Sequence, residues 1–261
     1  MNAKALLLLV LFALATTSCI PTKDLIYLQG DPAQTAAVQS IPRQAYRLQP
    51  NDILDINIKA IDPELVRVFA PTETLNTVQR SEQSVYFNGF IVDERGNIRM
   101  PLLEQVSVIG LTLDETRQRI EKRLLDEHFT EDANIFVVVK LAGFRFTVNG
   151  EVANPGQQIL YQDQVNLLEA VASAGDITTV GDRKSVTVIR RTAGRTQMHT
   201  LDLTDVSALE SPYFYLQPND YVYVKPLPQK ALGTGTTAMQ SLSTIITVLS
   251  LLTTVTILLT R

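Results

Sequence analysis

Cysteine and histidine are scarce in this sequence of 261 residues, which contains one Cys and two His. A single Cys cannot form a disulfide within the chain, and neither His128 nor His199 belongs to a metal-ligand motif. The sequence also lacks a Gly-x-Ser-x-Gly elbow and a phosphate-binding loop. We therefore expect no catalytic residue, no cofactor, no metal site and no enzymatic activity.

Paired acidic residues leave one enzymatic alternative open. Asp93-Glu94, and Asp202 with Asp205, have the chemistry for sugar hydrolysis, which needs two carboxylates roughly 5 to 9.5 Å apart across the scissile bond. We interpret these residues as solvated turn residues instead, because each pair lies in a polar stretch between strand-like segments.

Positive charge is also in short supply. The chain has 23 Lys and Arg against 27 Asp and Glu, which gives a net charge of -4. This balance argues against nucleic acid as a partner. With 45% apolar and 19% charged residues, the composition is that of a globular protein with one or two packed domains.

The N-terminal residues 1–18 have the pattern of a secretory signal peptide. Lys4 supplies a positive charge, Ala5 to Ala15 are uniformly apolar, and small residues follow. An uncleaved membrane anchor is the alternative, but these eleven apolar residues are fewer than the roughly 20 that cross a bilayer as a helix.

Cys19 follows the small residues directly, at the position where bacterial lipoproteins are acylated. Thr16 and Ser18 depart from the Leu and the Gly or Ala that usually precede this cysteine. A buried small hydrophobe or a reactive thiol are the alternatives for a lone Cys. We predict that Cys19 carries lipid, palmitate included, and that residues 19–45, with Pro but no sustained period, form a lipid-anchored tether.

The C-terminal segment lacks charge from Ala231 to Thr260. We predict a linker over 227–237 and a transmembrane helix over 238–261. The 23 uncharged residues from Ala238 to Thr260 would span roughly 34 Å as a helix, and a hydrocarbon core is about 30 Å thick. Polar residues recur on one side of this helix as candidate pore-lining residues: Gln240, Ser243, Thr244, Thr247, Ser250 and Thr254. Two alternatives are a lone anchor whose hydroxyls bond to its own carbonyls, and a pair of strands.

The middle of the chain has the pattern of two α+β units. In the first, Leu54 to Ala60 alternate as a half-buried strand, a hairpin is expected around Asp93 to Asn97, and a capping box at Thr112 opens a charged helix that ends near His128. Its apolar edge contains Leu113, Ile120, Leu124 and Phe129. The second unit is mostly strand, with one short helix that Gly175 ends.

One short sequence occurs twice. Leu48 to Asp52 reads Leu-Gln-Pro-Asn-Asp, and Leu216 to Asp220 repeats it before the last strand. Pro presets a turn and Asn tolerates left-handed geometry, so we predict that the same turn is used twice, with a structural role.

The order of these segments resembles that of the bacterial polysaccharide export proteins, the Wza-like outer-membrane auxiliary lipoproteins. Tyr46–Ile56, Val92–Pro101 and Gly110–Thr112 are similar to the family's export domain. Its sugar-associated β-grasp module, called SLBB, is resembled by Val148–Val152, Asn154–Gly156, Leu167–Gly175 and Asp220–Val224. The fold class predicted is therefore α+β: an export domain over 46–143, a β-grasp domain over 144–226, and one transmembrane helix.

The resemblance implies a function as well. Members of this family form homo-oligomeric rings in the periplasm, and their C-terminal helices form a barrel through the outer membrane. The implied role is passive export of a capsule or exopolysaccharide, delivered by an inner-membrane co-polymerase of the tyrosine-kinase type. The folded domains would lie in the periplasm, with Cys19 in outer-membrane lipid. The alternative is a monomeric membrane-anchored sugar-binding or scaffold lipoprotein without a pore.

Two departures from the family bear on this expectation. The best-known members carry two β-grasp modules, whereas this sequence has one. Asp176 follows Gly175 where a second Gly is common. We therefore expect a shorter stack of rings.

Overall fold

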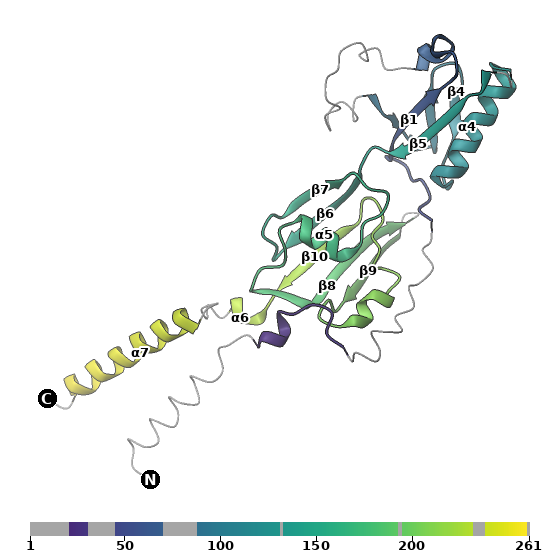
Figure 1. Ribbon diagram of the computed structural model, residues 1–261. Helices are drawn as coiled ribbons and strands as arrows, with labels where there is room; N and C mark the ends of the chain where they lie inside the picture. The colour runs from purple at the N-terminus through teal and green to yellow at the C-terminus, as the bar shows by residue number, and fades with distance from the viewer. Residues whose placement is uncertain are drawn as a thin grey trace. The chain divides into compact units, whose positions relative to one another are not determined.

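The computed structural model describes residues 21–30, 45–69, 88–130, 133–192, 195–231 and 238–259. The chain divides into two compact units (Figure 1). The first unit takes residues from 42–144 and 159–165, and the second takes the remaining residues. Residues 159–165, which the sequence placed in the β-grasp domain, group with the first unit, although Ile159 and Leu160 are also the last residues of β7 in the sheet of the second unit.

The first unit is built on a three-stranded antiparallel sheet. Its order is β2 (Phe90–Ile91), β1 (Ile53–Lys59), β5 (Phe136–Leu141), so β1 is the central strand. Leu54, Ile56 and Ile58 are buried while Asp55 and Asn57 are half-buried, which confirms the predicted alternation.

The predicted hairpin around Asp93 forms only its turn. The Asp93 carboxylate accepts hydrogen bonds from the backbone amides of Arg95 at 2.9 Å and Asn97 at 2.8 Å. The flanking strands pair elsewhere: β2 joins β1, and β3 (Asn97–Met100) joins β4 (Glu104–Ser107). Gly96 has φ +82, and a Cβ there would lie 2.3 Å from the Ile109 Cβ.

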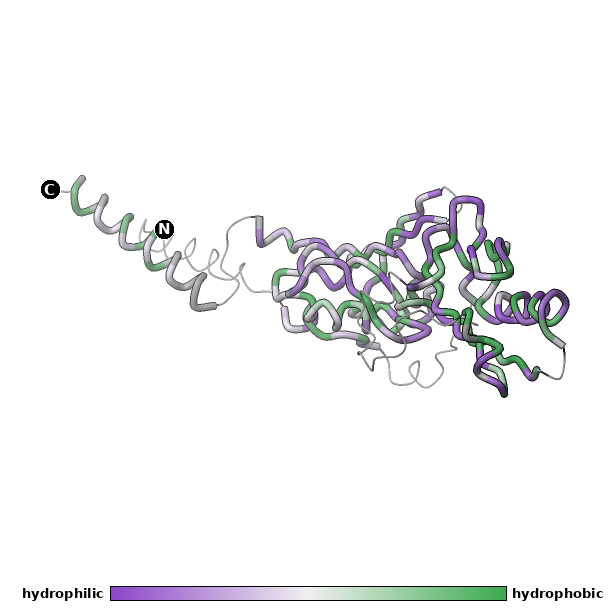
Figure 2. The backbone as a smooth tube through the Cα atoms, turned by 90° about the horizontal axis from the view of Figure 1, so that it is seen from above, coloured by the Kyte–Doolittle hydropathy of each residue, from purple (hydrophilic) through white to green (hydrophobic). Residues whose placement is uncertain are grey.

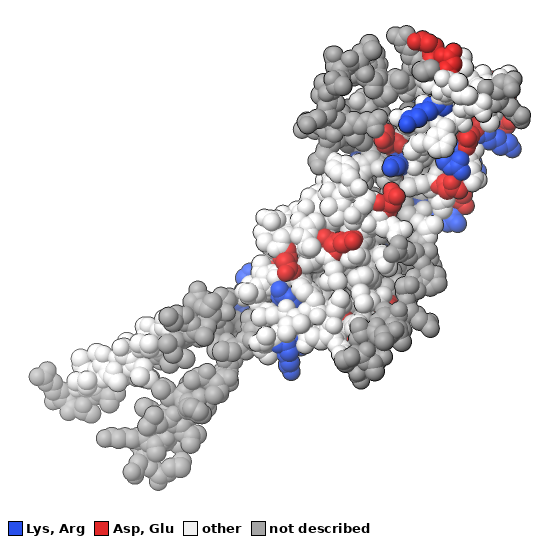
Figure 3. Space-filling model, in the orientation of Figure 1, with Lys and Arg blue, Asp and Glu red and all other residues white. Residues whose placement is uncertain are grey.

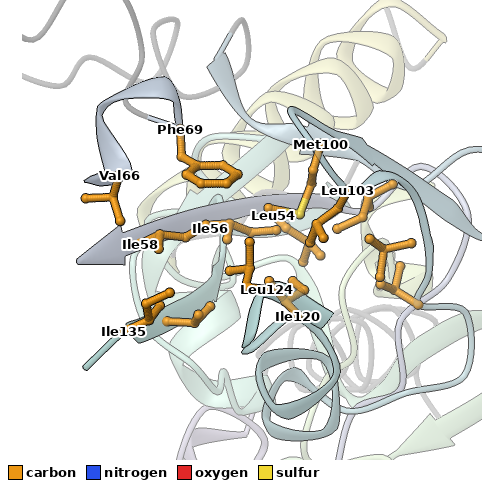
Figure 4. Packing of buried hydrophobic residues seen from close by; sticks show 14 of the residues in the cluster. Leu54, Ile56, Ile58, Val66, Phe69, Met100, Leu103, Ile120, Leu124 and Ile135 are labelled. Atoms are coloured by element: carbon orange, nitrogen blue, oxygen red, sulfur yellow. The ribbon is translucent and has the colours of Figure 1, made fainter. Parts of the chain in front are cut away.

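Helix α4 (Leu113–Glu127) covers the core of the first unit. Its predicted capping box is confirmed: the Thr112 hydroxyl accepts from the Glu115 amide, and the Glu115 carboxylate accepts from the Thr112 amide. Ile120 and Leu124 are fully buried, and Figure 4 shows them facing Leu54 of β1. Charged side chains gather over α4 on its solvent side (Figure 3). A 3-10 helix, η2 (Pro63–Phe69), contributes Phe69 to the same core.

The second unit is built on a five-stranded sheet in the order β7-β6-β10-β8-β9. Strands β6 and β10 are parallel, whereas β10 with β8 and β8 with β9 are antiparallel. Helix α5 lies over this sheet, and 3-10 helix η4 follows β9 (Figure 1). The bounds are β6 Phe144–Gly150, β7 Gly156–Leu160, α5 Leu167–Ser173, β8 Gly181–Thr192, β9 Arg195–Leu201, η4 Val206–Glu210 and β10 Tyr221–Pro226.

The repeated Leu-Gln-Pro-Asn-Asp sequence does form the same turn twice. Asn51 has φ 72 and Asn219 has φ 68. Asp52 and Asp220 are both buried, and each carboxylate accepts the amide three residues earlier, at 2.8 Å from Gln49 and 2.7 Å from Gln217. The prediction is confirmed, because a left-handed Asn lets the carboxylate return to its own turn.

The prediction of a transmembrane helix over 238–261 is wrong. A helix does form there, α7 (Ala238–Leu259), after the short α6 (Pro228–Ala231). Within the described residues, however, no helix is long and apolar enough to cross a membrane. Gln240 and eight Ser or Thr interrupt the apolar residues of α7, so that no more than three apolar residues are consecutive, and Figure 2 shows green residues separated by pale ones along this helix.

Candidate functional site

The two predicted sites fall on the N-terminal and C-terminal parts of the chain. Cys19 and the signal peptide lie outside the described residues, so lipidation stays a prediction. The candidate pore-lining residues lie on α7: Gln240, Ser243, Thr244, Thr247, Ser250 and Thr254. Their lining of a pore also stays a prediction.

Hydroxyl groups of α7 bond within the helix. The Thr247 hydroxyl donates to the Ser243 carbonyl at 2.8 Å, and the Thr254 hydroxyl donates to the Ser250 carbonyl at 2.7 Å. Thr253, outside the predicted stripe, donates to the Leu249 carbonyl at 3.0 Å. These contacts agree with the alternative given above for this segment, in which the hydroxyls donate hydrogen bonds to backbone carbonyls one turn earlier in the same helix.

Residues 21–30, which we call the N-terminal clasp, follow shortly after Cys19 and contact the second unit. After the 3-10 helix η1 (Thr22–Asp24), the Leu28 amide donates to the Leu203 carbonyl at 3.0 Å. The Gln29 amide donates to the Thr204 carbonyl at 2.6 Å, and the Gln29 carbonyl accepts from the Val206 amide at 3.0 Å. The predicted tether is therefore held to the folded protein over these residues.

Side chains strengthen the clasp. Asp24 forms an ion pair of 2.6 Å with Lys184 of β8. The Tyr27 hydroxyl donates to the Asp176 carboxylate, and the Arg183 guanidinium lies 5.2 Å from the centre of the Tyr27 ring. Burial, and then the hydrogen bond to Asp176, raise the pKa of Tyr27 to about 12.

Asp176 follows Gly175 at a position where a second Gly is common, and the structure shows how an Asp fits there. It has φ 72, a left-handed conformation that Asp tolerates better than most residues. Its carboxylate accepts from the Ile177 amide at 2.6 Å as well as from Tyr27. Asp at this position thus keeps the turn and adds an acceptor for the clasp.

A buried ion pair holds β8 to the turn before β10. The Arg190 guanidinium contacts both oxygens of Asp220, with Nε at 3.0 Å from Oδ1 and Nη2 at 2.7 Å from Oδ2. Arg190 also donates to the Tyr215 carbonyl at 3.0 Å. Burial raises the pKa of the Asp220 carboxyl, and the Arg190 guanidinium opposes that rise.

An aromatic stack lies next to this ion pair. The Tyr213 ring has the Arg190 guanidinium 5.2 Å from its centre and the His199 ring 3.4 Å away, nearly parallel. No motif in the sequence marks Arg190. The sequence signal that could identify Arg190 as a buried residue is the two-residue period of β8, which places residue 190 on the same face as the fully buried Val186 and Val188.

Metal chemistry finds no support in the part of the chain that the structure describes. No group of three or more His, Cys, Asp or Glu residues there is placed to hold an ion. The buried carboxylates are instead engaged by backbone amides or by Arg190.

Two family models match the chain at positions that fit its two folded regions. The model described as polysaccharide biosynthesis/export protein matches residues 40–140, and the SLBB domain model matches residues 144–224. The chain belongs to the polysaccharide export protein family. The resemblance drawn from the sequence is thereby confirmed.

Two curated relatives of this polysaccharide export protein come from the genus Ralstonia. The EPS I polysaccharide export outer membrane protein EpsA of Ralstonia nicotianae is 31% identical over 152 residues, 56% of this chain and 38% of the relative. The protein of the same name from Ralstonia solanacearum is 28% identical over 188 residues, 69% of this chain and 48% of the relative. The chain thus spans less than half the length of these relatives.

Proposed function

We propose that this chain is a component of polysaccharide export at the outer membrane. The observation that carries the proposal is the succession of an export domain and an SLBB domain in one chain, together with relatives named polysaccharide export outer membrane proteins. In this proposal the folded domains lie in the periplasm, and acylated Cys19 anchors the chain in outer-membrane lipid.

The finer proposal is a passive conduit made of several copies of the chain. A homo-oligomeric ring surrounds the polymer, which an inner-membrane co-polymerase of the tyrosine-kinase type delivers. Contacts with the polymer are many and weak, since a translocated chain must be released as readily as it is bound. Helix α7 is given no membrane-spanning role, because that prediction is wrong.

The N-terminal clasp supports the anchoring part of the proposal. Three residue steps separate Cys19 from Thr22, the first residue of η1, and they reach at most about 11 Å. Lipid on Cys19 would therefore hold the second unit close to the membrane surface, rather than at the end of a long flexible tether.

The first experiment measures the mass of the complex. The full chain is purified from membranes in mild detergent and its mass is measured by light scattering. A defined ring of several copies is expected. A monomer in several detergents contradicts the ring and favours the alternative, a monomeric sugar-binding or scaffold lipoprotein.

The second experiment tests export in cells. A strain without its own copy of the gene receives the wild-type chain or Cys19→Ser, and surface polysaccharide is measured. Wild type should restore export. Cys19→Ser should be expressed but lost from the outer-membrane fraction, with reduced export. Full export without this chain would contradict the proposed role, and normal membrane fractionation of Cys19→Ser would contradict lipidation alone.

A further inference from the structure

The sheet of the second unit has one face on the core and one face toward solvent. Along β6, β8 and β10, alternate residues such as Phe146, Val188 and Val222 are almost fully buried. The residues between them point to the opposite side, since side chains alternate along a strand. We call that opposite side, at the twelve positions named below, the open face.

Strand register arranges the open face in three rows across four strands. The pairs Thr147 with Tyr221, Tyr221 with Ile189, and Ile189 with Met198 give one row, and the next row follows two residues along. Two rows, in the order β6, β10, β8, β9, are Thr147-Tyr221-Ile189-Met198 and Asn149-Tyr223-Thr187-Thr200. The third joins Arg145 of β6 to Asn219 in the turn before β10, and Arg191 of β8 to Thr196 of β9.

The rows form a patch that solvent reaches at most of its positions, although Thr187 within it is buried. From strand spacing it measures about 13 Å along the strands and about 14 Å across them. Met198 is 67% exposed. Five other positions are also exposed: Asn149, Arg191, Thr196, Thr200 and Asn219.

Two tyrosines lie next to each other along the central strand of this patch. The Asn149 side-chain amide donates to the Tyr221 hydroxyl at 2.7 Å. The Thr187 and Thr200 hydroxyls lie 3.2 Å apart on the neighbouring strands. Half-buried aromatic rings bordered by amide and hydroxyl groups offer both an apolar surface and hydrogen bonds.

Charge on the open face has one sign. Arg145 and Arg191 are its two charged residues, and none of the twelve positions is acidic, although the whole chain carries a net charge of -4. A merely solvated sheet face of an acidic protein would be expected to mix signs or to carry more Asp and Glu than Lys and Arg.

We propose that the open face binds an acidic polysaccharide, one whose sugars carry carboxylates. Tyr221 and Tyr223 stack on the apolar faces of sugar rings, Asn149 and the exposed Thr196 and Thr200 bond sugar hydroxyls, and Arg191 pairs with a carboxylate. This inference rests on the proposed function, because it names the substrate class and a surface that contacts it.

The test measures binding of fluorescein-labelled oligogalacturonate to the full chain in detergent by fluorescence anisotropy. Labelled dextran of similar length is the uncharged comparison. Arg191→Glu is paired with Arg195→Glu, since Arg195 is also exposed on the same hairpin but lies on the other side of the sheet. Tyr223→Leu is paired with Tyr223→Phe, and circular dichroism checks the fold of each variant.

Oligogalacturonate should bind more tightly than dextran, and rising salt should weaken its binding. We expect Arg191→Glu to weaken it about five-fold or more, and Arg195→Glu to change it less than about two-fold. Tyr223→Leu should weaken it about three-fold or more while Tyr223→Phe does not. Equal losses for the two Arg variants, or equal binding of both sugars, would overturn the proposal.

Two further readouts separate this inference from the proposed function. If Arg191→Glu reduces the mass of the complex instead of sugar binding, the open face is a contact between copies and the inference fails. If wild type restores export but oligogalacturonate does not bind, the inference fails while the proposed function stands. If oligogalacturonate binding follows the variants but export is not restored, the proposed function fails and the sugar site remains.

Discussion

Replacing Asp220 with Asn should lower the free energy of unfolding by about 3–5 kcal/mol, because it leaves the Arg190 charge buried without its partner. The side chains are 9% exposed for Arg190 and 1% exposed for Asp220, so water cannot replace the lost carboxylate. Asn still accepts the Gln217 amide, which lies 2.7 Å from the carboxylate, so the turn itself should persist.

An exposed pair of similar geometry provides the control. Arg123 contacts both oxygens of Glu127 on α4, at 2.8 and 3.0 Å, with side chains 34% and 42% exposed. Glu127→Gln should therefore destabilise the protein far less than Asp220→Asn, as for other exposed helix pairs. Comparing the two substitutions separates the effect of burial from that of bidentate geometry.

The measurement is urea unfolding of the full chain, followed by circular dichroism, with hydrogen exchange to locate the loss in the second unit. A double variant, Arg190→Met with Asp220→Asn, should be more stable than Asp220→Asn alone, since it removes the unpaired charge. The reasoning is refuted if Asp220→Asn costs no more than Glu127→Gln, or if the double variant is the less stable.

Three smaller perturbations test other contacts. The Tyr27 phenol should titrate at unusually high pH in ultraviolet difference spectra, since its pKa in the folded protein is raised to about 12. The stability that its hydrogen bond to Asp176 supplies is present below about pH 10 and is lost as the pH rises through about 12. The signal of this late-titrating phenol should be absent in Tyr27→Phe. Gly96→Ala should destabilise the first unit more than Gly110→Ala: both have positive φ, but the new Cβ meets a side chain at 2.3 Å in the first case and nothing within 4 Å in the second. Thr112→Ala should cost about 1 kcal/mol in urea unfolding, and Thr112→Ser should restore most of it.

Local signals in this sequence predict local structure well. The alternation of β1, the capping box at Thr112 and the repeated turn before Asp52 and Asp220 all form as the sequence indicates. Each depends on residues within a few positions of one another, so each can be inferred without knowing the rest of the fold.

Contacts between residues far apart in the chain are harder to predict from the sequence. The turn residues at Asp93 predict a hairpin, because such a turn commonly joins two neighbouring antiparallel strands. In the structure, however, β2 pairs with β1 and β3 pairs with β4. Residues 21–30 carry no period, and their order comes from partners such as Leu203 and Asp176, far along the chain. A helix does form over Ala238–Leu259, as its uncharged length indicates, but Ser and Thr interrupt its apolar residues, and no helix of the described residues is long and apolar enough to span a membrane.

The N-terminal clasp and the segment that leads into α6 meet at one end of β8. The clasp reaches Lys184 through Asp24, and Leu227, directly before α6, donates to the Val180 carbonyl at 2.8 Å. If Cys19 carries lipid, as proposed, this end of the second unit faces the membrane surface, because Thr22 lies only three residue steps from Cys19. The rows of the open face follow one another along β8 with increasing distance from that end. Its Tyr and Arg residues would therefore lie between the membrane surface and the opposite end of the sheet.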